Sequence, residues 1–201
     1  MRISAVERQQ KRVYRVSIYI DGDFLVGLSE AALLKSGLRA GQEITEQQKA
    51  ELLELADYDM AREKVLSLLA RRPRSQWEMQ TYLQRKAYDV SVINKLLGEL
   101  RRRGYVDDGA FAEWWVQQRR LLKSISKNKL KMELRQKRIA DDIIDGVLAK
   151  DVTPDVETIK ELIAKKQQQS RYRDRQKLMQ YLARQGFHYG DIKDALEESD
   201  D

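Results

Sequence analysis

The chain has 201 residues, of which 42% are hydrophobic and 35% are charged, with 10 glycines and only 2 prolines. Many charges and few chain-breaking residues are typical of helix-rich soluble structure. With no cysteine and the single histidine His188, the sequence excludes disulfide scaffolds, thiol nucleophiles and cysteine- or histidine-based metal cages. The formal net charge of +6 favours an anionic partner.

Other classes of function are excluded by the distribution of residues along the chain. No apolar run approaches the roughly 20 residues that span a bilayer, and charges appear among the first eight residues before a signal-peptide core could form. We therefore expect a cytoplasmic protein without a membrane partner. No residues combine a nucleophile, a base and an orienting group, so we expect no enzymatic activity, no metal and no cofactor.

The first predicted element is a β-hairpin with apolar residues at every second position. A two-residue turn at Asp21-Gly22 would pair Ile20 with Asp23. A three-residue loop instead places Ile20 opposite Phe24, and this register keeps the apolar side chains on one face, so we favour it. The pairs predicted by the longer loop are Ile20 with Phe24, Ile18 with Val26, and Val16 with Leu28.

From Ser29 onward the sequence predicts helices. A short helix is opened by Ser29 and closed by Gly37, and Thr45 with Gln48 forms a capping box for a helical segment that continues to Pro73. The paired carboxylates Asp107-Asp108 and Asp141-Asp142 each stand just before a helical run. Anionic caps are expected there, so we interpret both pairs as caps rather than as catalytic or metal-binding groups.

A unit of two helices and a tight turn occurs three times. Shifts of 51 and 99 residues superimpose six positions of the first copy on the other two, and 17 of the 18 positions are apolar or aromatic, with Glu133 as the exception. The same shifts align the N-caps Ser75, Ser126 and Asp174. The aligned positions are Met79, Tyr82, Leu83, Tyr88, Ile93 and Leu97; Leu130, Glu133, Leu134, Ile139, Ile144 and Leu148; and Leu178, Tyr181, Leu182, Phe187, Ile192 and Leu196.

An additional amphipathic helix precedes each copy, at about 58–72, 110–123 and 156–169. The predicted fold is therefore mainly α, a tandem array of three three-helix, helix-turn-helix-like repeats with a small N-terminal β-hairpin extension. The predicted domains are 1–50 for the hairpin and short helix, 51–106, 107–152 and 153–201 for the repeats, the last with an acidic tail.

Positive charge is concentrated in the second repeat. Nine cations and one carboxylate lie between Arg119 and Arg138, which indicates either a solvated face or a surface for phosphates or an acidic protein groove. Trp114 and Trp115 point about 100° apart on a helix, so either one is exposed for stacking or the two form core and rim. The candidate contact residues are Arg101, Arg102, Arg103, Trp114, Arg119, Arg120, Lys123, Lys127, Lys129, Lys131, Arg135, Lys137 and Arg138.

Three segments resemble the RecX family, regulators of the RecA recombinase. The stretch Gly104-Tyr105-Val106-Asp107-Asp108-Gly109-Ala110-Phe111-Ala112 is similar to its GY-x-DD-x-x-FA signature, and Arg74-Ser75-Gln76-Trp77-Glu78-Met79 is similar to a second family motif. The segment Tyr19-Ile20-Asp21-Gly22-Asp23-Phe24 resembles the hairpin extension of longer members. The motif at Gly104 reads physically as a joint, in which Gly104 takes a left-handed conformation, Tyr105 packs back and an Asp caps the next helix.

The resemblance implies a non-enzymatic modulator that binds the RecA–single-stranded DNA filament and restrains its ATPase and strand exchange. Single-stranded DNA is then a weak partner or one reached through the filament, and we expect a monomer. Reversing the charges of Lys127, Lys129 and Lys131 is expected to abolish inhibition without changing the far-UV circular dichroism. The alternatives are a sequence-specific double-stranded DNA regulator, which predicts base-dependent affinity without a recombinase, and a helical scaffold that binds no nucleic acid.

Overall fold

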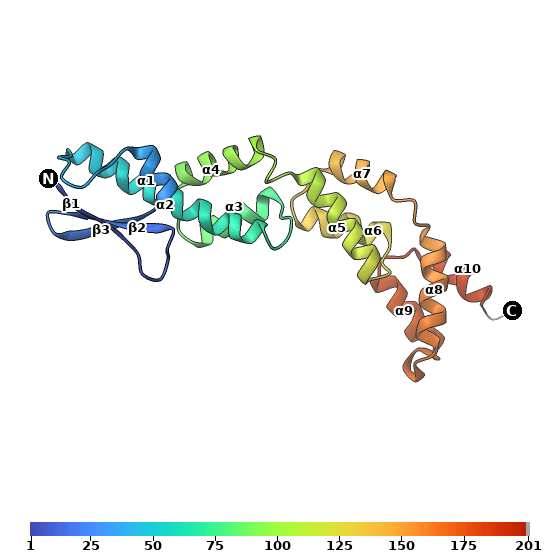
Figure 1. Ribbon diagram of the computed structural model, residues 1–201. Coiled ribbons are helices and arrows are strands. Elements are labelled where there is room, and N and C mark those ends of the chain that lie inside the picture. Colours follow the sequence, from blue (N-terminus) through green and yellow to red (C-terminus); the bar gives the residue numbers. More distant parts are fainter. Residues whose placement is uncertain (200–201) are drawn as a thin grey trace. The chain divides into compact units, whose positions relative to one another are not determined.

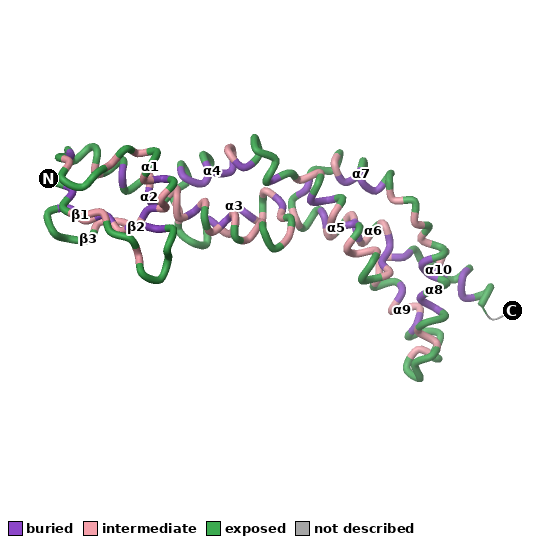
Figure 2. The backbone as a smooth tube through the Cα atoms, viewed as in Figure 1, coloured by how far each residue is buried: buried purple, intermediate pink, exposed green. Residues whose placement is uncertain are grey.

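The computed structural model describes residues 1–199, so the last two residues of the predicted acidic tail lie outside the described part of the chain (Figure 1). The chain divides into two compact units. The first contains Met1–Arg72 and Met79–Tyr105, and the second contains Pro73–Glu78 and the residues from Val106 on. In both units, buried positions alternate with exposed ones along each helix, as expected for helices that cover a core on one side (Figure 2).

The N-terminal extension is a three-stranded antiparallel sheet, which contains the predicted hairpin and one strand that was not predicted. Strands β2 (Arg15–Ile20) and β3 (Asp23–Ser29) form the predicted hairpin, and β1 (Ile3–Arg8) pairs with β2 to give the order β1-β2-β3. The sequence prediction missed β1 because its pairing shifts between Ile3 and Ala5, which breaks the period of two expected for a strand.

The hairpin combines features of both predicted turns. Val16 pairs with Leu28 and Ile18 with Val26, as predicted, but the Ile20–Phe24 pair is wrong: Ile20 lies opposite Asp23, and Phe24 pairs with Tyr19. Asp21 and Gly22 both have positive φ, 51° and 100°, as a two-residue type I′ turn requires. The register shift after Ile18 absorbs the extra residue, so the tight turn and the apolar pairing coexist.

Two helices cover this sheet. Helix α1 (Glu30–Ser36) has the predicted caps, because Ser29 accepts a hydrogen bond from the Ala32 amide and Gly37 has φ 66°. Helix α2 (Glu46–Leu69) begins with the predicted Thr45–Gln48 capping box and is continuous. It therefore runs through residue 50 and through 58, where the sequence predicted the start of a separate helix.

The core of the sheet region lies between the sheet and α2. Ile3, Ile18 and Leu28 from the three strands are completely buried, and they belong to one cluster with Leu52 and Ala56 of α2. Burying this apolar area favours attachment of the strands to the helix, since a small sheet is not stable alone.

The three predicted repeats are present. The second of the six aligned positions is half-buried in every repeat, where it is occupied by Tyr82, Glu133 or Tyr181. Its partial exposure explains why a glutamate is tolerated there. The aligned leucines Leu83 and Leu134 are completely buried. The helices are α3 (Gln76–Arg85) and α4 (Val90–Arg102) after α2; α5 (Asp108–Leu122), α6 (Lys127–Gln136) and α7 (Asp141–Lys150); and α8 (Asp155–Gln167), α9 (Arg175–Arg184) and α10 (Tyr189–Glu197), with a 3₁₀ turn at Ser170–Tyr172.

The correspondence among repeats extends to the backbone of the tight turn. The residue before the large turn residue has a positive φ in each copy: 57° at Ala87, 58° at Arg138 and 89° at Gly186. The amide of the following residue then donates to the carbonyl five residues earlier, a Schellman-type closure. These bonds join Tyr88 to Leu83 (3.3 Å), Ile139 to Leu134 (3.2 Å) and Phe187 to Leu182 (3.5 Å).

The predicted caps of these repeats are confirmed at three positions. The hydroxyl of Ser75 accepts from the Glu78 amide, that of Ser126 accepts from the Lys129 amide, and the carboxylate of Asp174 accepts from two amides at the start of α9. These bonds satisfy amide groups that the helix itself leaves unpaired.

The joint at Gly104 is confirmed in part. Gly104 has φ 71°, and Asp107 accepts hydrogen bonds from the amides of Gly109 and Ala110 at the start of α5. Tyr105 is exposed, however, and Val106 is the residue buried at this place, so the prediction that Tyr105 packs back is wrong.

The predicted cap at Asp141-Asp142 is also wrong. The N-cap of α7 is Ala140, whose side chain makes no capping hydrogen bond. Asp141 and Asp142 lie in the first turn, where their negative charge still interacts favourably with the helix dipole.

Gly146 offers a simple test of the helix assignment. It lies inside α7, is exposed, and a Cβ added to it meets nothing within 4 Å. We expect Gly146→Ala to raise the free energy of unfolding by about 0.5–1 kcal/mol, because alanine restricts the unfolded chain and favours helix. Gly104→Ala, which also faces open space but has φ 71°, should lower it by about 1 kcal/mol. Thermal unfolding that gives both changes the same sign would contradict the assignment.

Candidate nucleic-acid and partner interface

The basic stretch of the second repeat spans the end of α5, the connecting loop, α6 and the turn before α7. Most of its cations are held by groups of the same unit. An ion pair reduces the charge available to a partner, so these internal pairs decide which of the cations can contact a ligand.

Arg120 has a structural role. Its guanidinium, which is largely buried, donates to the Asp151 carboxylate at 2.6 and 3.0 Å and to the Ile125 carbonyl at 2.6 Å. A second carboxylate, that of Asp155, lies 3.7 Å away. Arg120 therefore joins the end of α5 to the segment that leads into α8, and it is not available to a ligand.

Asp151 makes this contact pH-dependent. Burial raises the pKa of Asp151, but the hydrogen bonds from Arg120 and Thr153 and the positive charge of Arg120 outweigh it, so that the pKa lies below the usual value of 3.8. A lowered folded-state pKa contributes stability above the unfolded value and loses it as the pH falls through the folded value. We expect the free energy of unfolding of Asp151→Asn to fall less steeply than that of the parent protein as the pH drops below about 4. The free energies come from urea unfolding followed by circular dichroism at several acidic pH values, and equal slopes against pH for the two proteins would contradict this.

Arg119 and Lys137 surround Trp115 rather than forming an open patch. The indole nitrogen donates to the Glu133 carboxylate at 2.9 Å, and Arg119 pairs with the same carboxylate at 2.6 Å. The Arg119 guanidinium lies 4.4 Å, and the Lys137 ammonium 5.1 Å, from the ring centre. Trp114 and Trp115 are both partly buried and pack against the core residue Phe111, so neither is exposed and neither belongs to the core.

The side chains of Lys127, Lys129 and Lys131, whose charge reversal was considered above, also have partners within the second unit. The Lys127 ammonium donates to the Asp151 carbonyl at 2.6 Å, and that of Lys129 donates to the Arg184 carbonyl. Lys131 pairs with Asp145 of α7 at 2.5 Å. A carboxylate at these positions would face acceptors, so the expectation of an unchanged fold after triple reversal no longer follows from the structure.

The remaining candidates fall into two groups. Arg135 pairs with Asp141 at 2.7 Å, and Arg103 with Glu99 at 3.0 Å, but both cations are more than half exposed. Such exposed pairs are worth little and can be exchanged for a ligand. Within residues 1–199 the other exposed candidates have no ion-pair partner: Arg101, Arg102, Lys123 and Arg138.

The third repeat has a basic segment outside this candidate set. Lys165 and Arg173 are exposed, and neither has an ion-pair partner in the described part of the chain. Next to them, the rings of Tyr172 and Tyr181 lie 5.2 Å apart, and the Lys166 ammonium is 4.8 Å from the Tyr181 ring centre. Burial raises the pKa of Tyr181, with a further contribution from Tyr172. The sequence showed these cations of the third repeat, but the second repeat has more cations and was therefore favoured. The sequence alone did not show that fewer of the cations in the third repeat are held in ion pairs.

Charge is also divided between helices of the last two repeats. The middle helices are basic: α6 has four cations and one carboxylate, and α9 has three cations and no carboxylate. The final helices are acidic: α7 and α10 each have three carboxylates and one lysine. A polyanion is therefore favoured along the middle helices and opposed along the final ones.

Comparisons with known proteins cover most of the chain. Family models described as the RecX N-terminal domain and the first, second and third three-helix domains of RecX match residues 1–45, 61–100, 107–148 and 154–196. The chain is 35% identical to the regulatory protein RecX of Amycolatopsis mediterranei over 74% of its length and 90% of the relative's. It is 26% identical to that of Clostridium acetobutylicum over 98% and 95%.

Solved structures give the same result for the fold. A crystal structure of a regulatory protein RecX superimposes with a TM-score of 0.72 and 28% identity over 96% of this chain and 98% of that chain. A RecX structure from Lactobacillus salivarius gives a TM-score of 0.60 at 23% identity over 72% and 97%. Among residues 1–199, every helix is too short or too polar to cross a membrane.

Proposed function

Because this chain belongs to the RecX family, we propose that it binds the RecA filament on single-stranded DNA and lowers its ATPase and strand-exchange activity. The observation that carries this proposal is the match of all four RecX domains, in order, along one chain. The relatives are named regulatory proteins, so the proposed activity is modulation of another protein in the cytoplasm rather than catalysis.

The contact surface that we propose consists of cations without internal partners. In the second repeat, Lys123 and Arg138 remain exposed, and in the third repeat Lys165 and Arg173 do. Each of these retains its full charge for a phosphate or a partner carboxylate. Arg101 and Arg102 are the corresponding residues in the first unit.

The charge of the final helices argues against the double-stranded DNA alternative. In a helix-turn-helix protein, the helix after the tight turn enters the major groove. In the second and third repeats this helix is α7 or α10, and each has more carboxylates than cations. Phosphates on both sides of the groove would repel these helices, which disfavours insertion.

A binding experiment distinguishes the proposals. Wild-type protein is titrated onto RecA filaments assembled on labelled oligothymidylate, onto oligothymidylate alone and onto random duplexes, with fluorescence anisotropy as the readout. We expect the filament to be bound more tightly than either naked nucleic acid, with no dependence on duplex sequence. Sequence-dependent duplex binding of equal or greater affinity would contradict the filament proposal.

Charge-neutralised variants test the surface. Lys165→Gln with Arg173→Gln should reduce the slope of log affinity against log salt by about 1.4, at about 0.7 for each phosphate contact on a single strand. The matched control is Lys160→Gln with Lys193→Gln in the same repeat, since these exposed lysines lie beside the carboxylates of Glu198 and Glu197, which repel a phosphate. Equal changes in slope for both variants would exclude the surface in the third repeat.

A further inference from the structure

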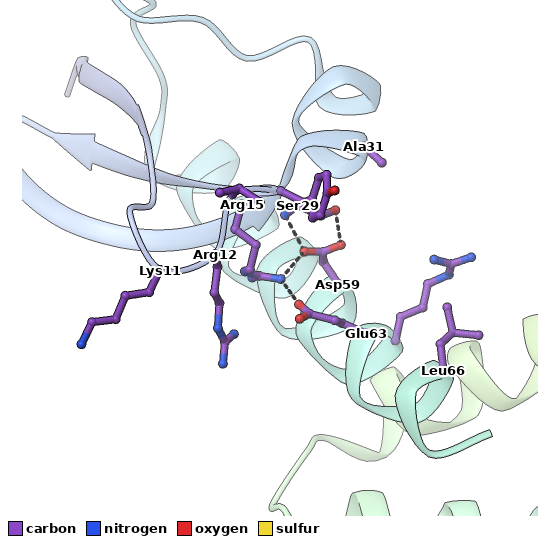
Figure 3. Close-up of a pocket in the computed structure, with 11 residues that line it drawn as sticks. Lys11, Arg12, Arg15, Ser29, Ala31, Asp59, Glu63 and Leu66 are labelled. Atoms are coloured by element: carbon purple, nitrogen blue, oxygen red, sulfur yellow. Dashed lines mark hydrogen bonds and ion pairs between the residues drawn. The ribbon is translucent and has the colours of Figure 1, made fainter. Parts of the chain in front are cut away.

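A cavity of about 670 Å³ lies in the first unit, between the β1–β2 loop and helices α1 and α2 (Figure 3). Its size is in the range of ligand-binding clefts. The loop contributes Lys11, Arg12, Val13 and Tyr14 to the wall, and none of these residues belongs to the surface proposed above.

The loop is held firmly at its base. The Gln9 amide donates to the Arg15 carbonyl at 2.9 Å, and the Arg15 amide donates to the Arg12 carbonyl at 2.8 Å. On the other side, the Glu30 amide at the start of α1 donates to the Tyr14 carbonyl at 3.0 Å. These bonds hold the wall of the cavity in place before any ligand arrives, which reduces the entropy lost on binding.

The wall exposes apolar surface. Val13 is 62% exposed and Tyr14 is 77% exposed. Leu66 of α2 also lines the cavity. Exposed apolar residues are common when scattered singly, but two adjacent ones beside a preformed cavity favour an apolar side chain from a partner.

The charged groups at the floor of the cavity are paired with one another. The Arg15 side chain, only 4% exposed, donates to Glu63 at 2.5 Å, Asp59 at 3.2 Å and the Gly27 carbonyl at 2.8 Å. Asp59 also accepts from the amide and hydroxyl of Ser29, at 2.7 and 2.6 Å. Figure 3 shows the side chains of Arg15, Ser29, Asp59 and Glu63 facing one another. The floor therefore needs no additional ion, and its two carboxylates oppose a phosphate in the cavity.

The rim, in contrast, has unused positive charge. Lys11 and Arg12 are exposed, and neither side chain has a hydrogen bond or ion pair in the part of the chain that the structure describes. A smaller cavity continues along α2 past Glu63, and Arg12 and Arg71 both line it. The cavity therefore has positive charge at its rim, apolar side chains on its wall and an ion-paired cluster with two carboxylates at its floor.

We propose that this cavity binds an acidic peptide segment through one bulky apolar side chain. The apolar side chain enters between Val13, Tyr14 and Leu66, and carboxylates on either side of it pair with Lys11 and Arg12. A single-stranded nucleic acid fits less well, because its evenly spaced phosphates would have to pass over Glu63. The inference rests on the N-terminal unit alone and does not depend on RecA binding.

The probe is a fluorescein-labelled dodecapeptide of alternating Asp and Glu with one central Phe, titrated into the full chain. We expect Lys11→Glu with Arg12→Glu to weaken binding at least about tenfold, as for the loss of paired charges at an interface. Val13→Ser with Tyr14→Ser should weaken it by a similar factor. Lys35→Glu with Arg39→Glu is the control, since both cations are exposed in the same unit and neither lines the cavity.

Two further probes define the outcomes that overturn the proposal. Replacing the central Phe by Ser should remove most of the affinity, and an oligothymidylate of equal charge should bind more weakly than the peptide. Tighter binding of the oligothymidylate, with the same loss in Lys11→Glu/Arg12→Glu, would identify a nucleic-acid surface instead. Absence of peptide binding up to about 1 mM, or equal weakening by the control variant, would also overturn it.

Discussion

Replacing Gly186 by alanine is expected to lower the free energy of unfolding of the second unit by about 2–4 kcal/mol, because overpacking adds to the cost of a left-handed backbone. Gly186 has φ 89°, and a Cβ there would lie 2.5 Å from the Ser126 hydroxyl and 2.9 Å from the Lys129 Cβ. Neither atom can move easily, since Ser126 is completely buried and caps α6.

The expected effect is large because this glycine lies where two repeats meet. The Ser126 amide donates to the Gln185 carbonyl at 3.1 Å, so the start of α6 rests on the tight turn of the third repeat. An equivalent contact occurs one repeat earlier, where the Ser75 hydroxyl donates to the Lys137 carbonyl at 3.2 Å. Lys137 and Gln185 occupy the same position of the repeat, so one cap-to-turn contact is used twice within the second unit.

Gly190→Ala is the matched control for this prediction. Gly190 lies four residues later, in the first turn of α10, and a Cβ added there meets nothing within 4 Å. We expect Gly190→Ala to leave the urea unfolding midpoint unchanged or slightly raised. If Gly186→Ala unfolds at the same urea concentration as Gly190→Ala, the close contact between the repeats is not present in solution.

Substituting Arg15 by methionine is expected to cost about 3 kcal/mol, because removing one member of a buried charge cluster leaves its partner uncompensated. Asp59 would remain largely buried with its hydrogen bonds from Ser29, whereas Glu63, which is half exposed, would become hydrated. The expected cost is therefore at the lower end of that found for fully buried pairs.

A second substitution isolates the charge effect. In Arg15→Met/Asp59→Asn, the amide oxygen still accepts from Ser29 while the uncompensated charge is gone, so we expect more than half of the lost stability to return. Both free energies of unfolding come from urea titrations followed by far-UV circular dichroism. A change of less than about 1 kcal/mol in Arg15→Met, the worth of an exposed pair, would show that Arg15 does not hold the sheet to α2.

The features predicted correctly from sequence are those set by short-range rules. The caps at Ser29, Thr45 and Ser126 depend on residues three positions away, and the threefold alignment of apolar residues depends on helical period. The Asp21-Gly22 turn shows the limit of such rules: its local preference for two residues was correct, but the compensating shift in β2–β3 pairing follows from the whole sheet.

The contact surface could not be predicted in the same way because ion pairs form between distant parts of the chain. Lys137 pairs with Glu78, 59 residues away, and Arg120 with Asp151, 31 residues away. A count of charges along the sequence therefore overestimated the free positive charge of the second repeat. It gave too little weight to Lys165 and Arg173, which are exposed and have no ion-pair partner in the described part of the chain.

The proposed regulation is tested most directly by ATP hydrolysis of RecA on circular single-stranded DNA, measured while this protein is added from far below to equal molar amounts. We predict that the rate falls steeply at substoichiometric protein and that Lys165→Gln/Arg173→Gln shifts the inhibition curve to higher concentration, while Lys160→Gln/Lys193→Gln does not. An unchanged rate up to one molecule of this protein per RecA monomer would contradict the proposal.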